Sequence, residues 1–183
     1  MLLLFPHLAN WEVIGVWCDQ QRMNLHAMYQ PPRQAWLDPI MRQAREDNGS
    51  SVYPTDTGGV RSLLKALKAG HVVGILPDQE PEEEGGVFAP FFGVPALTMT
   101  LAQKLARRTR CELVMCAVRR VPGGFEIDCD ALDPAVASDD TATSTRAMNT
   151  ALEHAILRAP AQYQWEYKRF KKRNDGGAKR YPS

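Results

Sequence analysis

Two short runs without a polar side chain, residues 2–5 and 72–76, constrain the fold most strongly. A strand with one exposed face alternates apolar and polar residues, whereas a strand covered on both faces is a continuous apolar run. Both runs are too short for ordinary helices, and Pro6 and Pro77 end them. The chain therefore needs helices on both sides of a sheet that contains these two strands.

Segments with helical signals alternate with the strand-like segments. Asp38-Pro39 combines a capping side chain with a first-turn proline, and Gly70 ends an amphipathic run. On such signals we expect helices starting after a capping Asn10, from Asp38 to about residue 47, over residues 58–69 and 98–108, and after a capping Ser138. Further strands are expected at residues 25–29, 112–118 and 125–129, the last two joined by a turn at 122–124.

This alternation predicts an α/β fold with a mostly parallel central sheet, helices on both faces and an antiparallel hairpin late in the chain. The 183 residues suit one domain, and with neither repeats nor linkers we expect residues 1–183 to form it. The composition, 44% apolar and 23% charged, is that of a globular protein. The formal net charge of +1 gives no reason to expect nucleic acid as a partner.

The charge distribution says more than its sum. Acidic side chains gather between residues 78 and 84, and basic ones between 168 and 180. Residues 162–165 are rich in aromatic side chains and directly precede the basic segment, as in segments that lie at a membrane interface. A membrane surface or another anionic partner is therefore expected, although a solvated face or a protein–protein surface has the same composition.

His7 follows the first apolar strand, at the carboxyl end where open α/β sheets place their sites. On one ideal helix, His7 and Glu12 would point about 140° apart, so they can meet only if His7 stands on the turn before the helix. Pro6 favours that turn. An imidazole that takes a hydroxyl proton, with a carboxylate to fix its tautomer, is a general base. The alternative is a capping or core histidine beside an unrelated surface glutamate.

Asp78 follows the second apolar strand, so it lies at the same edge as His7 if the two strands are parallel. It could orient a donor or support an arginine, or it could be a solvated loop carboxylate. Magnesium is disfavoured because the consecutive residues 82–84 cannot readily face one ion. We therefore expect no metal site.

Two arginines and two phenylalanines are further candidates. Arg45 and Arg61 could bind phosphate bidentately, or they could be ordinary surface residues. Phe91 and Phe92 could line an acyl pocket, although core packing is the simpler interpretation. No cysteine or serine is set beside His7 as a nucleophile.

Several blocks in fixed order resemble a known family. They are His-Leu-Ala-Asn-Trp-Glu at 7–12, Tyr-Gln-Pro-Pro at 29–32, the stretch 59–70, Leu-Pro-Asp-Gln at 76–79, the stretch 87–96 around Pro-Phe-Phe-Gly, and 160–165 and 168–173. Together they are similar to the bacterial late acyltransferases of lipid A biosynthesis, the lauroyl/myristoyl transferase family within the lysophospholipid and glycerolipid acyltransferase superfamily. The resemblance covers about residues 4–174.

The resemblance implies a site and a reaction. It makes His7 the base and Glu12 its partner, adds Arg45 and Asp78 as residues needed for activity, and leaves Arg61, Phe91, Phe92 and Asn10 for substrate binding. A fatty acyl group would move from acyl carrier protein to a hydroxyl of a lipid A precursor, without a cofactor, at the cytoplasmic face of the bacterial inner membrane. The hydroxyl would attack the thioester directly, without an acyl-enzyme, which agrees with the lack of a nucleophile beside His7. For the oxyanion of this reaction we expect backbone amides at the strand-to-helix turn.

Other outcomes stay open. The acceptor could be a lysophospholipid or another glycolipid, because acceptor choice depends on pocket shape. Family members carry a longer segment with a membrane-anchoring helix before the histidine block, and this chain is expected to lack it. An inactive lipid-binding remnant, or a thioester hydrolase, is therefore an alternative to a transferase.

Overall fold

The computed structural model of the chain describes residues 1–32, 34–177 and 180–181. Within them, six strands form one sheet in the order β3-β2-β4-β1-β7-β8. The strands are β1 (Leu2–Leu4), β2 (Leu25–Tyr29), β3 (Ser51–Pro54), β4 (Val72–Ile75), β7 (Leu113–Val121) and β8 (Gly124–Ala131). Neighbours pair in parallel except β7 and β8, which form an antiparallel hairpin. The predicted fold class is confirmed.

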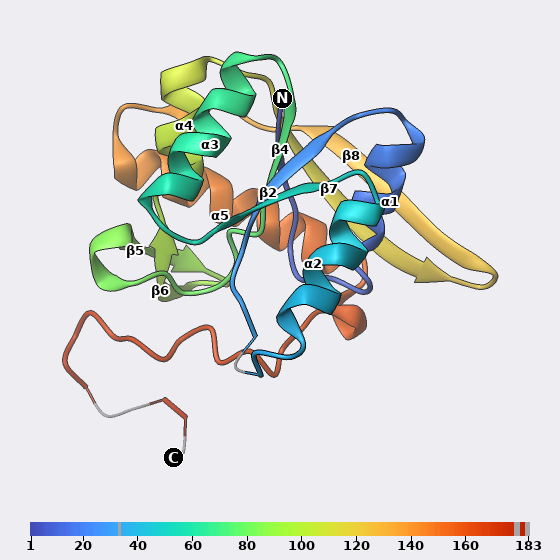
Figure 1. Cartoon of the computed structure of the whole chain (residues 1–183). Helices are drawn as coiled ribbons and strands as arrows, with labels where there is room; N and C mark the ends of the chain where they lie inside the picture. Colours follow the sequence, from blue (N-terminus) through green and yellow to red (C-terminus); the bar gives the residue numbers. More distant parts are fainter. Residues whose placement is uncertain (33, 178–179, 182–183) are drawn as a thin grey trace.

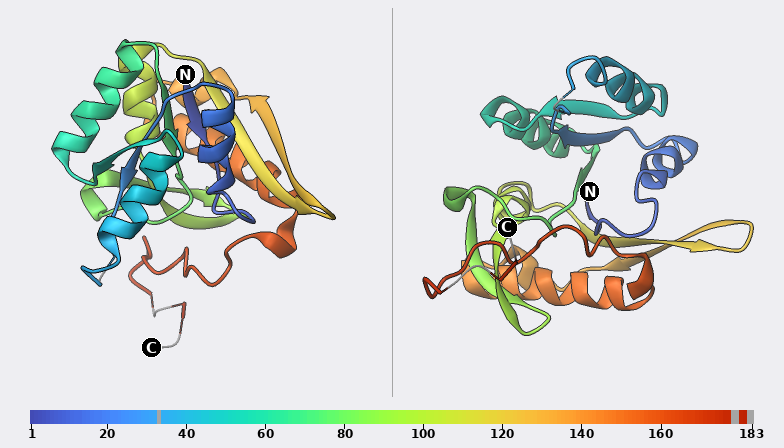
Figure 2. Two further views of the ribbon diagram at one scale, coloured as in Figure 1. Left: turned by 45° about the vertical axis from the view of Figure 1, so that its right-hand side comes forward. Right: turned by 90° about the horizontal axis from the view of Figure 1, so that it is seen from below.

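Helices cover both faces of this sheet. They are α1 (Val13–Gln20), α2 (Asp38–Asp47), α3 (Thr57–Lys68), α4 (Leu101–Thr109) and α5 (Thr141–Leu157). Side chains alternate along β1, so Leu2 and Leu4 enter the core under α3, α4 and α5, whereas Leu3 enters the core under α1. In Figure 2, the view from below shows α5 and α1 on opposite sides of the sheet. This two-sided burial explains why the strand lacks polar residues.

A second, two-stranded sheet was not expected. Strands β5 (Gly86–Phe91) and β6 (Val94–Met99) pair antiparallel, with Phe92 and Gly93 at positive φ in the turn between them. The prediction of a helix from residue 98 is wrong at its start, because residues 98 and 99 complete β6 and α4 begins at Leu101. Strand β3 was also missed.

Three predicted helix caps differ from the structure. Helix α1 begins at Val13 with Glu12 in the cap position, and Asn10 contributes its backbone carbonyl, which accepts from the Val13 N–H at 3.0 Å. In α2, Asp38 is the first helical residue, and Leu37 takes the cap position without a side-chain hydrogen bond.

At α5 the cap is Asp140, whose carboxylate accepts from the Thr143 N–H at 3.0 Å. This helix therefore starts two residues later than a cap at Ser138 would place it.

The parallel register brings two loops together at the carboxyl edge of the sheet. Leu4 of β1 lies opposite Ile75 of β4, so the residues that follow each strand are neighbours. The C-terminal segment, residues 158–177, runs along this same edge below the sheet (Figure 1) and pairs with the first loop through an antiparallel bridge between Leu8 and Tyr163. No helix in the described part of the chain is long and apolar enough to cross a bilayer.

Candidate active site

His7 and Asp78 form the centre of the edge where β1 and β4 end. The ring Nδ1 of His7 lies 2.7 Å from Oδ1 of Asp78, and the backbone N–H of His7 donates to Oδ2 at 2.8 Å. Asp78 is 1% exposed, so its carboxylate is buried against the histidine that it contacts. The prediction that both residues lie at one edge is confirmed.

This contact fixes how the imidazole is protonated. An ionised carboxylate only accepts hydrogen bonds, so Nδ1 of His7 carries a proton and donates it to Asp78. In the neutral ring, Nε2 then holds the lone pair that a general base needs. The edge of the ring packs against Trp11, with centroids 5.3 Å apart, and the His7 side chain is 15% exposed. His7 is thus held in one tautomer at a partly open position.

Glu12 does not provide the carboxylate for His7. Its two oxygens face Arg45 instead, with Oε1 2.5 Å from Nη2 and Oε2 3.3 Å from Nε. His7 does stand on the turn before α1, as the motif requires, but in this structure Asp78 takes the place expected for Glu12. The expected His7–Glu12 contact is therefore corrected to two separate pairs.

Aromatic rings hold the Arg45 side chain beside the histidine. Its guanidinium carbon lies 4.9 Å from the centre of the Tyr29 ring and 5.9 Å from that of Trp11. Trp11 thus contacts both His7 and Arg45. A planar cation fixed by a bidentate carboxylate and two rings suits recognition of an anionic group.

The C-terminal segment completes the site, which the sequence alone did not indicate. The Ala9 N–H donates to the Gln162 carbonyl at 2.9 Å, and the Gln164 N–H donates to the His7 carbonyl at 3.1 Å. On the second loop, the Glu80 N–H donates to the Tyr167 hydroxyl at 2.9 Å. This one segment therefore holds both the His7 loop and the Asp78 loop.

Two side chains of this segment, Tyr163 and Arg169, lie near the Asp78 carboxylate and interact with it electrostatically. Burial raises the pKa of the Tyr163 hydroxyl, and the neighbouring Asp78 carboxylate raises it further. Arg169 is 3% exposed and donates to the Leu97 carbonyl at 2.6 Å; its burial lowers its pKa. Tyr163 accordingly stays protonated and can donate to Asp78.

The other predicted substrate-binding residues lie apart from these contacts. Phe91 is 1% exposed and belongs to the core, whereas Phe92 is half-buried, 5.9 Å from the Trp165 ring. Asn10 is exposed on the turn before α1, and Arg61 is exposed on α3. Among the described residues, no three His, Cys, Asp or Glu side chains gather in a way that could hold a metal ion.

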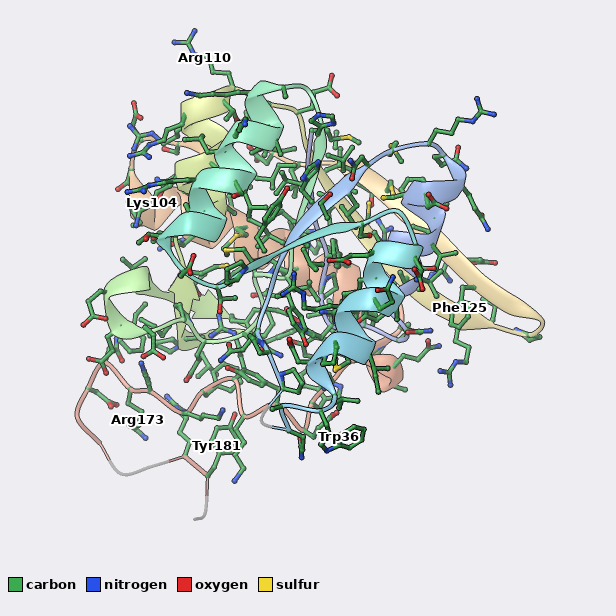
Figure 3. All side chains as sticks on the ribbon, viewed as in Figure 1. Trp36, Lys104, Arg110, Phe125, Arg173 and Tyr181 are labelled. Atoms are coloured by element: carbon green, nitrogen blue, oxygen red, sulfur yellow. The ribbon has the colours of Figure 1, made fainter. Side chains whose placement is uncertain are left out.

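Basic side chains occur at two ends of the molecule. Figure 3 shows Arg173, on the C-terminal segment, at the end of the molecule where β1 and β4 finish. Lys104, on α4, and Arg110, directly after α4, lie at the other end. The strong cationic charge near the site comes from Arg45 and from residues 168–173 of the segment.

A buried carboxylate–imidazole pair lies beside a fixed guanidinium at the carboxyl edge of an α/β sheet, an arrangement suited to acid–base chemistry next to an anionic group. The sequence profile of bacterial lipid A biosynthesis acyltransferases matches residues 1–172. The chain belongs to this family.

Individual relatives agree with the profile. The chain is 34% identical to the lipid A biosynthesis lauroyltransferase of Escherichia coli K12, over 99% of this chain and 59% of that protein. It is 28% identical to a lipid A biosynthesis acyltransferase of Haemophilus influenzae, over 96% of this chain and 55% of that protein. A phosphatidylinositol mannoside acyltransferase of Mycobacterium tuberculosis is 27% identical, over 88% and 52%. The chain thus spans little more than half the length of these relatives.

Proposed function

We propose that this chain transfers a fatty acyl group from an acyl carrier protein thioester to a hydroxyl of a lipid A precursor, with His7 as the general base. The observation that carries the proposal is the His7–Asp78 pair, which leaves Nε2 of His7 unprotonated on a side chain that is 15% exposed. Membership of the lipid A acyltransferase family supports the acceptor class.

The reaction follows from the protonation of the ring. Nε2 of His7 removes the proton from the acceptor hydroxyl, and the oxygen attacks the thioester carbonyl as Asp78 stabilises the imidazolium. A carbon–oxygen bond forms and the carbon–sulfur bond breaks. The departing thiolate then takes from Nε2 the proton that came from the acceptor hydroxyl. The products are an ester and the free thiol of the carrier. No described cysteine or serine contacts the His7 ring, in keeping with direct transfer.

Arg45 is proposed to bind an acidic group of the acceptor. Lipid A precursors are phosphorylated, and a guanidinium held by Glu12 and stacked on Tyr29 is oriented before the substrate arrives. Glu12 then acts on the acceptor through Arg45. We propose that the chemistry occurs at a membrane surface, where the exposed Lys168 and Lys171 would face anionic lipid.

An acylation assay tests the proposal. Purified chain, acyl carrier protein thioester and lipid A precursor are mixed in detergent, and acylated lipid is measured for wild type and His7→Ala. We expect His7→Ala to lower kcat by about 1000-fold or more, because the base is lost. Equal acylation by wild type and His7→Ala would mean that this chain is not an acyltransferase of this kind. The result would favour the alternative of an inactive lipid-binding protein.

A different acceptor is the second candidate. It is favoured by the relative named phosphatidylinositol mannoside acyltransferase, which matches 88% of this chain. Running the same assay with a phosphatidylinositol mannoside as the acceptor separates the two. Preference for that lipid would change the proposed acceptor to a phosphatidylinositol mannoside and would leave the role of His7 unchanged. Equal loss of thioester with and without any lipid would indicate a hydrolase.

A further inference from the structure

Gln79 contacts the reactive nitrogen of His7. Its side-chain Nε2 lies 3.2 Å from Nε2 of the His7 ring, on the side opposite Asp78. Because Nδ1 donates to Asp78, the His7 Nε2 accepts, and the group that faces it must donate. The Gln79 amide N–H is such a donor. In the resting site the base is therefore capped by an amide.

The cap occupies the position that an acceptor hydroxyl needs. A hydroxyl that donates to His7 Nε2 must displace the amide, and the amide cannot move far. The Gln79 backbone lies between Asp78, which is bound to His7, and Glu80, whose N–H donates to the Tyr167 hydroxyl. Only the side chain is free to rotate, so the displaced amide stays beside the attacking oxygen.

The turn amides nearest the His7 ring are already in use. The His7 N–H donates to Asp78, the Leu8 N–H to the Pro6 carbonyl at 2.7 Å, and the Ala9 N–H to the Gln162 carbonyl. The amides of residues 7–9 therefore do not point into an empty oxyanion hole. A side-chain donor beside the reacting carbonyl can supply the hydrogen bond that these three amides do not.

We propose that the Gln79 side-chain amide caps His7 Nε2 in the resting site and donates to the thioester oxyanion during acyl transfer. The inference rests on the proposed function. As the acceptor oxygen bonds to the thioester carbon, the carbonyl electron pair moves to its oxygen, which is bonded to that same carbon. An amide displaced by the attacking oxygen is then close to the oxyanion. When the carbon–sulfur bond breaks, the charge disappears and the amide returns to His7.

Two substitutions at Gln79 separate the parts of this proposal. Gln79→Ala removes the donor, and Gln79→Glu keeps the shape but faces the oxyanion with an acceptor. We expect Gln79→Ala to lower kcat by about 100-fold, with KM for both substrates within about threefold, and Gln79→Glu to lower kcat further. Gln21→Glu, the same change at an exposed position on the end of α1, is the matched control and keeps wild-type kcat.

A second measurement needs no substrate. The pKa of His7, followed by NMR titration, rises in Gln79→Ala because the lone pair that the amide stabilised becomes free to bind a proton. An unchanged His7 pKa overturns the cap. A raised pKa with kcat within threefold of wild type overturns the oxyanion role. If wild type fails to exceed His7→Ala in the acylation assay, the proposed function fails while the titration still decides whether Gln79 caps the base.

Discussion

Two carboxylates lie near the same imidazole, and their surroundings differ sharply. Asp78 is 1% exposed, and each of its oxygens contacts His7. Glu12 is 45% exposed, and each of its oxygens faces Arg45. A charge pair in a buried position is screened far less than one at the surface. The two carboxylates therefore differ in what they hold: Asp78 fixes the protonation of the His7 ring, and Glu12 fixes the orientation of the Arg45 guanidinium.

The comparison also shows the limit of a spacing motif. His7 and Glu12 stand five residues apart in the sequence, whereas Asp78 joins His7 from a distant loop through the pairing of β1 and β4. Tertiary contacts thus select the partner of His7. Substitutions at Asp78, Arg45, Tyr163 and Glu12 test this difference, and their expected effect on catalysis falls in that order.

Asp78→Asn is expected to lower kcat by about 10³- to 10⁴-fold, because the asparagine amide can donate to Nδ1 and move the ring proton to Nε2. The measurement is the acylation assay at saturating substrates. Asp19→Asn, at an exposed position, serves as the control, and thermal unfolding confirms that both variants fold. An Asp78→Asn protein with more than a tenth of wild-type kcat would end the claim that this carboxylate governs His7.

Arg45→Lys should lower kcat/KM for the lipid acceptor by about 30-fold, because an ammonium cannot reproduce the bidentate contacts and ring stacking of a guanidinium. The loss is expected in KM, with the pH profile of kcat unchanged. Arg42→Lys, on the same helix and 51% exposed, is the control. Loss confined to kcat would place Arg45 in the chemical step instead.

Tyr163→Phe is expected to lower kcat by about tenfold, because it removes one hydrogen bond to an ionised group. In the wild type, burial raises the pKa of Tyr163, so its hydroxyl remains protonated throughout the neutral range and can donate to Asp78. Without that donor, Asp78 holds a proton on His7 more strongly, and the acidic limb of the kcat/KM profile moves to higher pH. A limb that stays in place, or moves to lower pH, would show that Tyr163 only supports the fold.

Glu12→Gln should have the smallest effect, about fivefold in kcat/KM for the acceptor, because a half-exposed ion pair contributes on the order of 1 kcal/mol. The acidic limb of the pH profile should not move. A fall in kcat as large as that of Asp78→Asn would show that Glu12, not Asp78, serves the base.

Much of the fold was predictable because it depends on local patterns. The strand at residues 25–29 and the helix at residues 38–47 match β2 and α2, since an apolar run and a first-turn proline act within a few residues. Strand β3 was missed because Ser51–Pro54 has one apolar aliphatic residue and ends in proline. The β5–β6 hairpin was missed because it pairs Pro90 with Pro95, residues that usually interrupt strands.

Some contacts of the site were likewise predictable from local patterns, and others were not. That His7 and Asp78 share an edge follows from two apolar runs and a parallel sheet, both readable in the sequence. The contacts of Tyr163 and Gln162 with the His7 loop join residues more than 150 positions apart, and no local pattern specifies them. Glu12 was assigned to His7 because they are close in sequence, but Arg45 offers it a full positive charge in reach.

Histidine NMR tests the division between the two carboxylates most directly. In ¹⁵N-labelled protein near neutral pH, with His7 assigned by the signals missing from His7→Ala, we expect a protonated Nδ1 and an unprotonated Nε2. Asp78→Asn should reverse this pattern, and Glu12→Gln should leave it unchanged. A His7 ring that changes tautomer in Glu12→Gln but keeps it in Asp78→Asn would contradict the claim that Asp78, and not Glu12, fixes the protonation of His7.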